Sequence, residues 1–248
     1  MISVVHEVPA VLPRMRVLSW NIRHGGGSRC SQIVTAILGH EADVVVLTEV
    51  RRSSAMLNDA LATAGWTHQA ATPLVGNANG VVVLGRSPLE VVDAGMPDRL
   101  RWVEVVVPTA GVRIAATHLW IEKDSRDAEW EAVLTRAATI FSEPTLIIGD
   151  LNTGMHCEDE AGATFSCSRH MRRLIDAGWL DAWRKFHPGE REFTWFSTRG
   201  GKQLNGFRID HAFVSPSLTA RVEACDYSHQ ERVSGASDHS ALVVSIGR

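Results

Sequence analysis

The stretch Thr145–Thr153, TLIIGDLNT, joins a short apolar run to polar residues whose chemistry is that of a reactive site. Its apolar part, Leu146–Ile148, is typical of a buried strand, and Asp150 and Asn152 follow it almost at once. A buried strand that delivers a carboxylate and a carboxamide at its end gives up core stability for polar groups, which favours a functional site. The alternative is a surface β-turn, since Gly, Asp and Asn are common turn residues.

The same arrangement recurs along the chain, which argues against a chance turn. Polar residues at or near the end of apolar runs, or just before the final run, are Asn21 in SWN, Glu49 in VVVLTE, His118 in IAATH, Asp150 and Asn152 in LIIGDLN, Asp210 in FRID, and Asp238 and His239 in SDH. The SDH motif precedes the last strand, and a strand that runs in the opposite direction begins at the rim where the others end. We therefore expect all these side chains to gather at one mouth of the fold.

The residue types in this set have a common chemistry. The carboxylates of Glu49, Asp150, Asp210 and Asp238 are hard oxygen ligands, and no Cys cluster lies near them in the sequence. Such a set favours Mg²⁺ or Mn²⁺ over Zn²⁺. Two histidines at the same rim can act as acid, base or phosphate contact near neutral pH. Carboxylates, a hard cation and histidines together fit the hydrolysis of a phosphate ester.

Many short strands with a few helices between them must position these residues. The predicted strands cover residues 15–22, 43–48, 80–84, 89–92, 102–107, 112–117, 146–148, 207–214, 221–225 and 240–246, and the predicted helices cover 31–40, 53–64, 124–141 and 168–177. Several connections are too short for a crossover helix, so the strands cannot all be parallel. The pattern favours two packed sheets with helices outside, in a single domain over residues 14–248 that follows a loose arm over residues 1–13.

Six motifs, SWN, LTE, THL, GDLN, RIDHAFVS and SDH, resemble in this order those of the endonuclease/exonuclease/phosphatase superfamily. The resemblance covers about Arg14 to Ile246. This group of Mg²⁺-dependent enzymes includes pancreatic deoxyribonuclease, exonuclease III, neutral sphingomyelinases and inositol polyphosphate 5-phosphatases. The resemblance implies an α/β fold, a four-layer α/β/β/α sandwich of two mixed sheets, which agrees with the predicted strands.

The resemblance also implies roles for the residues that match the family motifs. By similarity, Glu49 is the principal metal ligand with Asn21 beside it, His239 is the catalytic histidine, and Asp210 orients it. Asp150 and Asn152 resemble the pair that positions the attacking water and the scissile phosphate, and His118 resembles a phosphate-contacting histidine. Asp238 either forms a hydrogen bond within the site or binds a second metal. Arg208, in the family's RID pattern, is either structural or meets phosphate, and with Asn205 and Trp120 it completes the candidates for substrate contact.

For several residues, a purely structural role competes with a functional one. Packing is the favoured interpretation for Trp120, and His211 is expected to be a packed strand residue. Asp181 and Trp183 resemble a family pattern that supports the sheet. His156 and His170 are expected at the surface, His24 in a loop within reach of substrate, and Trp195 beneath the site or along a groove.

The charge is −3 overall, with 45% hydrophobic and 21% charged residues, so no basic field marks a nucleic-acid partner. Residues 166–208 nevertheless hold nine Lys or Arg against four Asp or Glu, an excess of five positive charges that either meets a phosphate backbone or is an ordinary solvated face. The four cysteines show no CxxC pair and no metal-finger spacing, which predicts reduced thiols in a cytoplasmic protein. No signal peptide and no membrane span are evident.

The substrate is less well defined than the reaction. The TWFS and NGFRID segments are similar to the exonuclease III branch and favour DNA, although the THL motif departs from that branch. We therefore expect a divalent-metal-dependent phosphodiesterase or nuclease acting on DNA, with no membrane and no obligate protein partner. The alternatives are a phosphatase or phosphodiesterase for phosphoinositide- or nucleotide-like small molecules, and a binding module without turnover.

Overall fold

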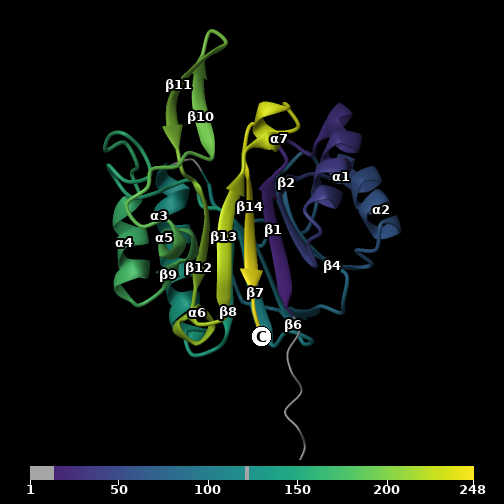
Figure 1. The fold of residues 1–248 in the computed structure, drawn as a ribbon, viewed down its shortest axis with the longest axis horizontal. Helices are drawn as coiled ribbons and strands as arrows, with labels where there is room; N and C mark the ends of the chain where they lie inside the picture. The colour runs from purple at the N-terminus through teal and green to yellow at the C-terminus, as the bar shows by residue number, and fades with distance from the viewer. Residues whose placement is uncertain (1–13, 121–122) are drawn as a thin grey trace, which may run out of the picture.

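The computed structural model describes residues 14–120 and 123–248, with the side chains of residues 123–126 left aside. The arm expected over residues 1–13 lies outside the described residues. Two six-stranded mixed sheets form the centre of the molecule (Figure 1).

The first sheet has the order β13-β14-β1-β2-β4-β3, and the second has the order β5-β6-β7-β8-β12-β9. The strands of the first sheet are β1 (Met15–Asn21), β2 (Val44–Val50), β3 (His68–Ala71), β4 (Gly80–Gly85), β13 (Val222–Ser228) and β14 (Ala241–Ile246). Those of the second are β5 (Glu90–Val92), β6 (Trp102–Val107), β7 (Val112–His118), β8 (Thr145–Asp150), β9 (Leu180–Asp181) and β12 (Asp210–Val214). The pairs β1–β2 and β7–β8 are parallel, and the other pairs in these two sheets are antiparallel.

The longer helices cover the outer faces of both sheets (Figure 1). The longer ones are α1 (Cys30–Gly39), α2 (Ala55–Thr63), α3 (Lys123–Thr139) and α4 (Ser168–Asp176), and the shorter ones are α5 (Ala182–Phe186), α6 (Pro216–Thr219) and α7 (Gln230–Val233). Two 3₁₀ turns, η1 (Gly27–Arg29) and η2 (Arg52–Ser54), lead into α1 and α2. No helix in the described part of the chain combines the length and the apolar character needed to cross a bilayer.

Alternate residues of the buried strands face two different apolar interiors. Val44 and Val46 of β2 lie in the core between the two sheets, whereas Val45 and Leu47 pack with α1. Because successive strand side chains point to opposite faces, a strand covered on both sides is apolar throughout. A third apolar cluster, around Trp130 of α3, fills the space between the second sheet and its helices. These three clusters separate four layers, so the predicted α/β/β/α sandwich is confirmed.

Two further strands, β10 (Trp195–Arg199) and β11 (Lys202–Phe207), form a separate hairpin that projects beyond the sheets (Figure 1). The prediction of one strand over residues 207–214 is therefore wrong. The chain leaves the hairpin at Phe207, and a new strand begins at Asp210. The break follows from Arg208, whose guanidinium is buried in ion pairs away from the hairpin. The short edge strand β3 was not predicted either.

Candidate active site

Strand ends bring the predicted polar residues to one rim of the two sheets. Asn21, His118 and Asp150 are the last residues of β1, β7 and β8, and Asp210 is the first residue of β12. The antiparallel register pairs Asp210 with Asp150, and the parallel register pairs His118 with Asp150. His239 stands just before β14, which runs antiparallel to β1. The expected gathering at one mouth is the arrangement found.

Asn21 joins the two sheets through its carboxamide. Its Nδ2 donates to Glu49 Oε1 at 3.1 Å and to Asp150 Oδ2 at 2.9 Å, and its Oδ1 accepts from the backbone N–H of Arg23 at 2.9 Å. The side chain is buried, so both carboxylates are held in place by it. Asn21 thus orients the acidic residues, and its oxygen keeps a second lone pair, so the metal-ligand role expected for it stays a prediction.

Glu49 lies at an irregularity of its strand. The register of β2 with β4 shifts between Thr48 and Val50, and Glu49 has a φ of 58°. Such a bulge re-aims one side chain at the cost of local pairing. The Glu49 carboxylate accepts from the backbone N–H of His24 at 2.8 Å and from Asn21. Burial alone would raise the pKa of Glu49, but His118 and these donors outweigh burial and lower it, so Glu49 is an anion at neutral pH.

Asp150 is the centre of the site. Its Oδ1 accepts from the backbone N–H of Asn152 at 3.0 Å, and its Oδ2 lies 3.9 Å from the Nε2 atoms of both His118 and His239. Burial and the neighbouring Asp210 carboxylate raise the pKa of Asp150 to about 7. Two ring nitrogens therefore converge on one carboxylate oxygen at distances too long for direct hydrogen bonds.

The close approach of β7 and β8 depends on Gly149. A Cβ at this position would lie 1.9 Å from the carbonyl oxygen of Thr117, and the φ of Gly149 is 146°. The absence of a side chain thus lets the two strand ends carry His118 and Asp150 side by side.

His239 and Asp210 form a buried pair. His239 Nδ1 lies 2.9 Å from Asp210 Oδ2, and both side chains are less than a tenth exposed. Burial alone would lower the pKa of His239, but Asp210 and Asp150 raise it to about 10. His239 is therefore a cation whose Nε2–H faces Asp150. Trp195 lies beside its ring, with the ring centroids 6.5 Å apart.

His118 is held in the opposite charge state. Arg101 Nη1 donates to His118 Nδ1 at 2.9 Å, which leaves the proton on Nε2, the nitrogen that faces Asp150. Burial and the Arg101 guanidinium lower the pKa of His118 to about 4. The guanidinium is stacked on Trp120, with its Cζ 3.4 Å from the ring centroid. Arg101 was not predicted from the sequence, because no motif contains it.

Trp120 packs in the way that was favoured for it. Besides the contact with Arg101, its Nε1 donates to Asp98 Oδ2 at 2.9 Å and its backbone N–H donates to Glu129 Oε2 at 2.8 Å. Its side chain does not line the pocket described next.

A pocket of about 340 Å³ opens over the polar residues. Its polar lining is His24, Glu49, Asp150, Asn152, Asp238 and His239, and its apolar lining is Phe165, Trp195, Phe207 and Ile209. Asp238 stands at its edge, half-exposed, 3.4 Å from Trp195 Nε1. Sequence reasoning missed Phe165, Phe207 and Ile209 as pocket residues. The aromatic density around Trp195 was the signal available for them.

Arg208 does not face this pocket. Its side chain is 1% exposed, and it pairs with Asp159 through Nε at 2.7 Å and with Asp181 through Nη2 at 2.5 Å. The expectation that Arg208 binds substrate is contradicted by this burial, and the structural alternative holds. Asp181 and Trp183 support the same ion-pair cluster, with the Arg208 guanidinium 4.9 Å from the Trp183 ring centroid.

Asn205 and His170 also lie away from the pocket. Asn205 is exposed on β11, where its backbone is hydrogen-bonded to Ser197 Oγ, and its expected substrate contact stays a prediction. His170, expected at the surface, is buried between α3 and α4. His211 is a buried strand residue, as predicted.

Comparison with known proteins identifies the family. The model described as the Endonuclease/Exonuclease/phosphatase family matches residues 18–239, and the chain belongs to this family of metal-dependent phosphoesterases. It is therefore a hydrolase that acts on phosphoester bonds. A DNA-(apurinic or apyrimidinic site) endonuclease of Dictyostelium discoideum is 24% identical over 262 residues, which cover 94% of this chain and 71% of that protein.

Two solved structures share the fold over nearly the whole chain. An AP endonuclease from Archaeoglobus fulgidus has a TM-score of 0.78 at 20% identity and covers 93% of this chain and 98% of its own. The 3′ phosphatase NExo from Neisseria, bound to a product DNA hairpin, has a TM-score of 0.77 at 22% identity and covers 94% of this chain and 100% of its own. At such identities the matches establish the fold.

The donor atoms at the rim fit a hard divalent cation. One ligand atom each from Asp150, Asp210 and His239 lies within 4.8 Å of the others, and Asn21 ties the Glu49 carboxylate to the same place. Asp150 and Asp210 are buried and Glu49 is partly exposed, and the His239 cation pairs with Asp210, so Glu49 and Asp150 are the carboxylates left to face a metal. The chemistry of these residues therefore fits a divalent cation.

Proposed function

We propose that this protein hydrolyses phosphodiester bonds of DNA with Mg²⁺, for which Mn²⁺ can substitute, and that its preferred target is a deoxyribose that has lost its base. The activity belongs to a single catalytic domain over residues 14–248. The observation that carries the proposal is the pocket in which acidic and histidine side chains face the apolar wall of Phe165, Trp195, Phe207 and Ile209.

The two sides of the pocket suit the two parts of such a substrate. A sugar without its base offers apolar C–H faces, which aromatic walls cover, and its phosphate suits the polar side. Moving a normal nucleotide out of a duplex costs the stacking free energy of its base, whereas a sugar without a base has no stacking to lose. The names of the relatives, an apurinic or apyrimidinic site endonuclease and a 3′ phosphatase bound to product DNA, support DNA as the substrate class.

The metal would be held by Glu49 and Asp150, whose carboxylates share the Asn21 amide, while Asp210 is engaged by His239 and Asp238 lines the same pocket. When bound, it would neutralise charge that develops on the phosphoryl oxygens. Mg²⁺ suits this set because it prefers oxygen ligands and keeps several waters.

The chain's own residues supply the remaining steps. His118 is neutral with its proton on Nε2, so it donates a hydrogen bond to a phosphoryl oxygen without titrating near neutral pH. His239, a cation paired with Asp210, stabilises the negative charge that develops on the phosphoryl group in the transition state. Asp150 accepts a proton from the attacking water or orients that water, and Asn152 Nδ2 donates to Leu119 O at 2.8 Å, which fixes the loop beside it.

The test is an incision assay on three labelled duplexes that carry an abasic analogue, a 3′-phosphate at a nick, or no lesion. We expect cleavage at the abasic analogue in Mg²⁺ or Mn²⁺, none in a chelator, and a loss of at least about 10²-fold in turnover for His239→Ala. His68→Ala, at a partly exposed histidine of the edge strand β3 outside the pocket lining, is the matched control. Cleavage of a small generic phosphodiester without action on any duplex would replace DNA by a small-molecule substrate. No hydrolysis with either metal would leave a binding protein.

A further inference from the structure

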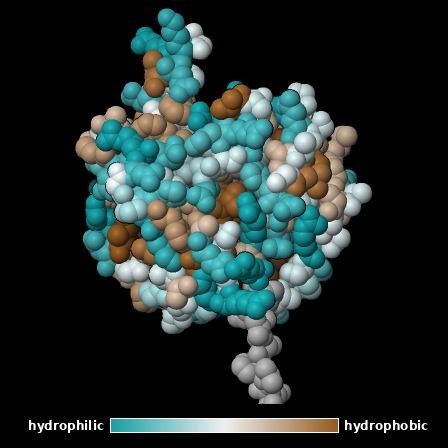
Figure 2. Space-filling model, in the orientation of Figure 1, coloured by the Kyte–Doolittle hydropathy of each residue, from teal (hydrophilic) through white to brown (hydrophobic). Residues whose placement is uncertain are grey.

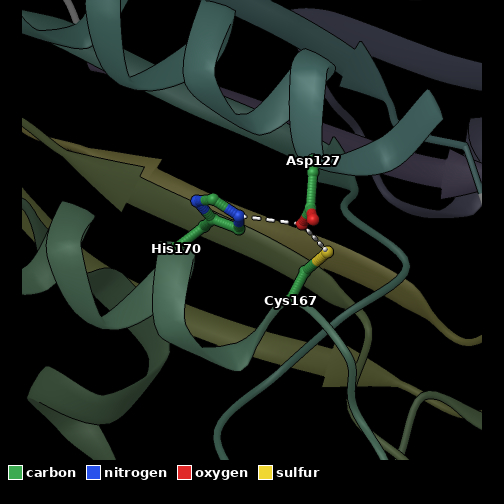
Figure 3. Close-up of side chains that lie close together, drawn as sticks. All are labelled: Asp127, Cys167 and His170. Atoms are coloured by element: carbon green, nitrogen blue, oxygen red, sulfur yellow. Dashed lines mark hydrogen bonds and ion pairs between the residues drawn. The ribbon is translucent and has the colours of Figure 1, made fainter. Parts of the chain in front are cut away.

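A second group of metal-ligating side chains lies outside the active site, between helices α3 and α4. Asp127 comes from α3, Cys167 is the residue before α4, and His170 is in its first turn (Figure 3). One ligand atom from each lies within 4.8 Å of the others. The spacing Cys-x-x-His places Cys167 and His170 at the N-terminal end of α4, where both face the Asp127 carboxylate of α3.

The three donor atoms converge on one another. Asp127 Oδ1 lies 3.4 Å from Cys167 Sγ and 2.9 Å from His170 Nε2 (Figure 3). Cys167 and His170 are buried, whereas the Asp127 side chain is 42% exposed. The group is thus closed on the helix side and open to solvent on the carboxylate side, which leaves room for a water as a further ligand.

Both ring nitrogens of the histidine lie next to carboxylates. Its Nδ1 lies 3.4 Å from Glu131 Oε1, and its ring is stacked on Trp130 at an interplanar angle of 8°. His170 Nε2 donates to Asp127 Oδ1 at 2.9 Å, so the proton is on the nitrogen nearest Cys167. A cation bound at Nε2 would move this proton to Nδ1, where the Glu131 carboxylate would accept it. The Cys167 thiol donates to the same oxygen, Asp127 Oδ1, at 3.4 Å.

Two arginines contact the His170 ring and must turn away when a cation binds. Arg169 Nη2 binds Asp127 Oδ2 at 2.8 Å, the oxygen turned away from Cys167, and Arg169 Nε lies 3.3 Å from His170 Nε2. Arg173 contacts Glu131 and lies 3.3 Å from His170 Nδ1. The side chains of Arg169 and Arg173 are 67% and 53% exposed, so they can turn into solvent when a cation enters.

We propose that Asp127, Cys167 and His170 form a site for a borderline-soft divalent cation such as Zn²⁺, which ties α3 to α4. A thiolate, an imidazole and a carboxylate are the ligands that Zn²⁺ takes, whereas the active site offers oxygens and histidines without sulfur. The thiol proton passes to solvent when the cation binds. The two sites thus divide hard and soft cations between them.

Cobalt(II) titration of the full-length protein tests the proposal, because a thiolate ligand gives a near-ultraviolet charge-transfer band that an oxygen and nitrogen site cannot give. We expect this band to saturate at one equivalent and to disappear on addition of Zn²⁺. Cys167→Ser should abolish it, and Cys157→Ser, at an exposed thiol, should leave it unchanged. The absence of the band in the wild-type protein, or its loss in Cys157→Ser alone, would overturn the site.

Two milder variants keep the test decisive if Cys167→Ser does not fold. Asp127→Asn changes one partly exposed ligand, and Glu131→Gln changes the carboxylate that faces His170 Nδ1 and binds Arg173. We expect Asp127→Asn to weaken cobalt binding at least about tenfold and Glu131→Gln to weaken it about 10–100-fold. Folded variants with unaltered cobalt affinity would show that the cluster is only a hydrogen-bonded contact between helices.

Discussion

The fate of Arg208 shows how one guanidinium can stand in a family motif near the active site and yet serve the fold. Its pairs with Asp159 and Asp181 are buried, and the carboxylates raise the pKa of Arg208, against the effect of burial, well above its ordinary value. A side chain so engaged has no hydrogen-bond donor directed at a substrate in the pocket.

We expect Arg208→Met to destabilise the protein by about 3–5 kcal/mol, because it leaves two buried carboxylates without their partner. The KM of the folded fraction for DNA should stay unchanged. Urea unfolding measures the first quantity and initial rates the second. An unchanged unfolding midpoint with a raised KM would restore the substrate-binding role.

The same ion pairs predict an acid limit to stability. Burial alone would raise the pKa of Asp159, but the Arg208 guanidinium lowers it to about 2. In the unfolded chain the pKa of this carboxyl is about 4. The unfolded state therefore binds the proton first, and the contribution of the pair is complete above about pH 4 and lost as the pH falls through about 2. The unfolding free energy of Asp159→Asn should depend less on pH in this window than that of the wild type, and parallel curves would contradict the prediction.

Single residues were predictable where a strand end carried them and unpredictable where a distant partner decided their role. Asp150 and His239 could be selected from their position after or before an apolar run. The role of Arg208 could not be assigned, because its ion-pair partner Asp159 lies in a loop without a recognisable sequence pattern. His170 was expected at the surface, since the sequence does not reveal that α3 packs over it.

At the scale of elements, the site depends on how closely two parallel strands approach. Most strands could be predicted from apolar runs, and their ends fixed which residues share a rim. The hairpin of β10 and β11 was missed, although Gly200 and Gly201, both with positive φ, are the usual signal of a tight two-residue turn. The bulge at Glu49 could not be predicted from the sequence, because it depends on the pairing of β2 with β4.

Gly149→Ala tests this element-level view. A Cβ there would meet the Thr117 carbonyl, so β7 and β8 would have to separate, and His118 would move away from Asp150. We expect a loss of more than about 1 kcal/mol in stability and a marked fall in turnover. Gly39→Ala, in α1 with no atom within 4 Å of the new Cβ, should leave turnover unchanged and raise stability by about 0.5–1 kcal/mol. Equal thermal stability and turnover of Gly149→Ala and wild type would refute the argument.

For the molecule as a whole, the class of fold could be predicted from the number and order of strands. The pocket could not be predicted, because its apolar wall joins residues from a loop, the hairpin and the segment before β12. Net charge was equally uninformative. A chain with a charge of −3 meets a phosphate backbone only through the local placement of its cations. The hairpin projects from the rim that carries the active site and is mainly hydrophilic, with the hydrophobic Leu204 54% exposed on it (Figures 1 and 2).

Arg199 and Lys202 flank the turn of this hairpin and are exposed, so we expect them to contact DNA phosphates beyond the cleavage point. Replacing either by Ala should reduce the slope of log K against log salt by about one and weaken binding equally for all sequences. The measurement is a salt titration of duplex binding in the His239→Ala background, where the DNA is not cleaved. Arg14→Ala removes the same charge at the first residue before β1, the opposite end of that strand from Asn21, and should leave the slope unaltered. If Arg199→Ala and Lys202→Ala behave like Arg14→Ala, the hairpin does not bind the DNA backbone. The phosphates must then be bound by cations around the pocket, such as the exposed Arg23 beside Asp238.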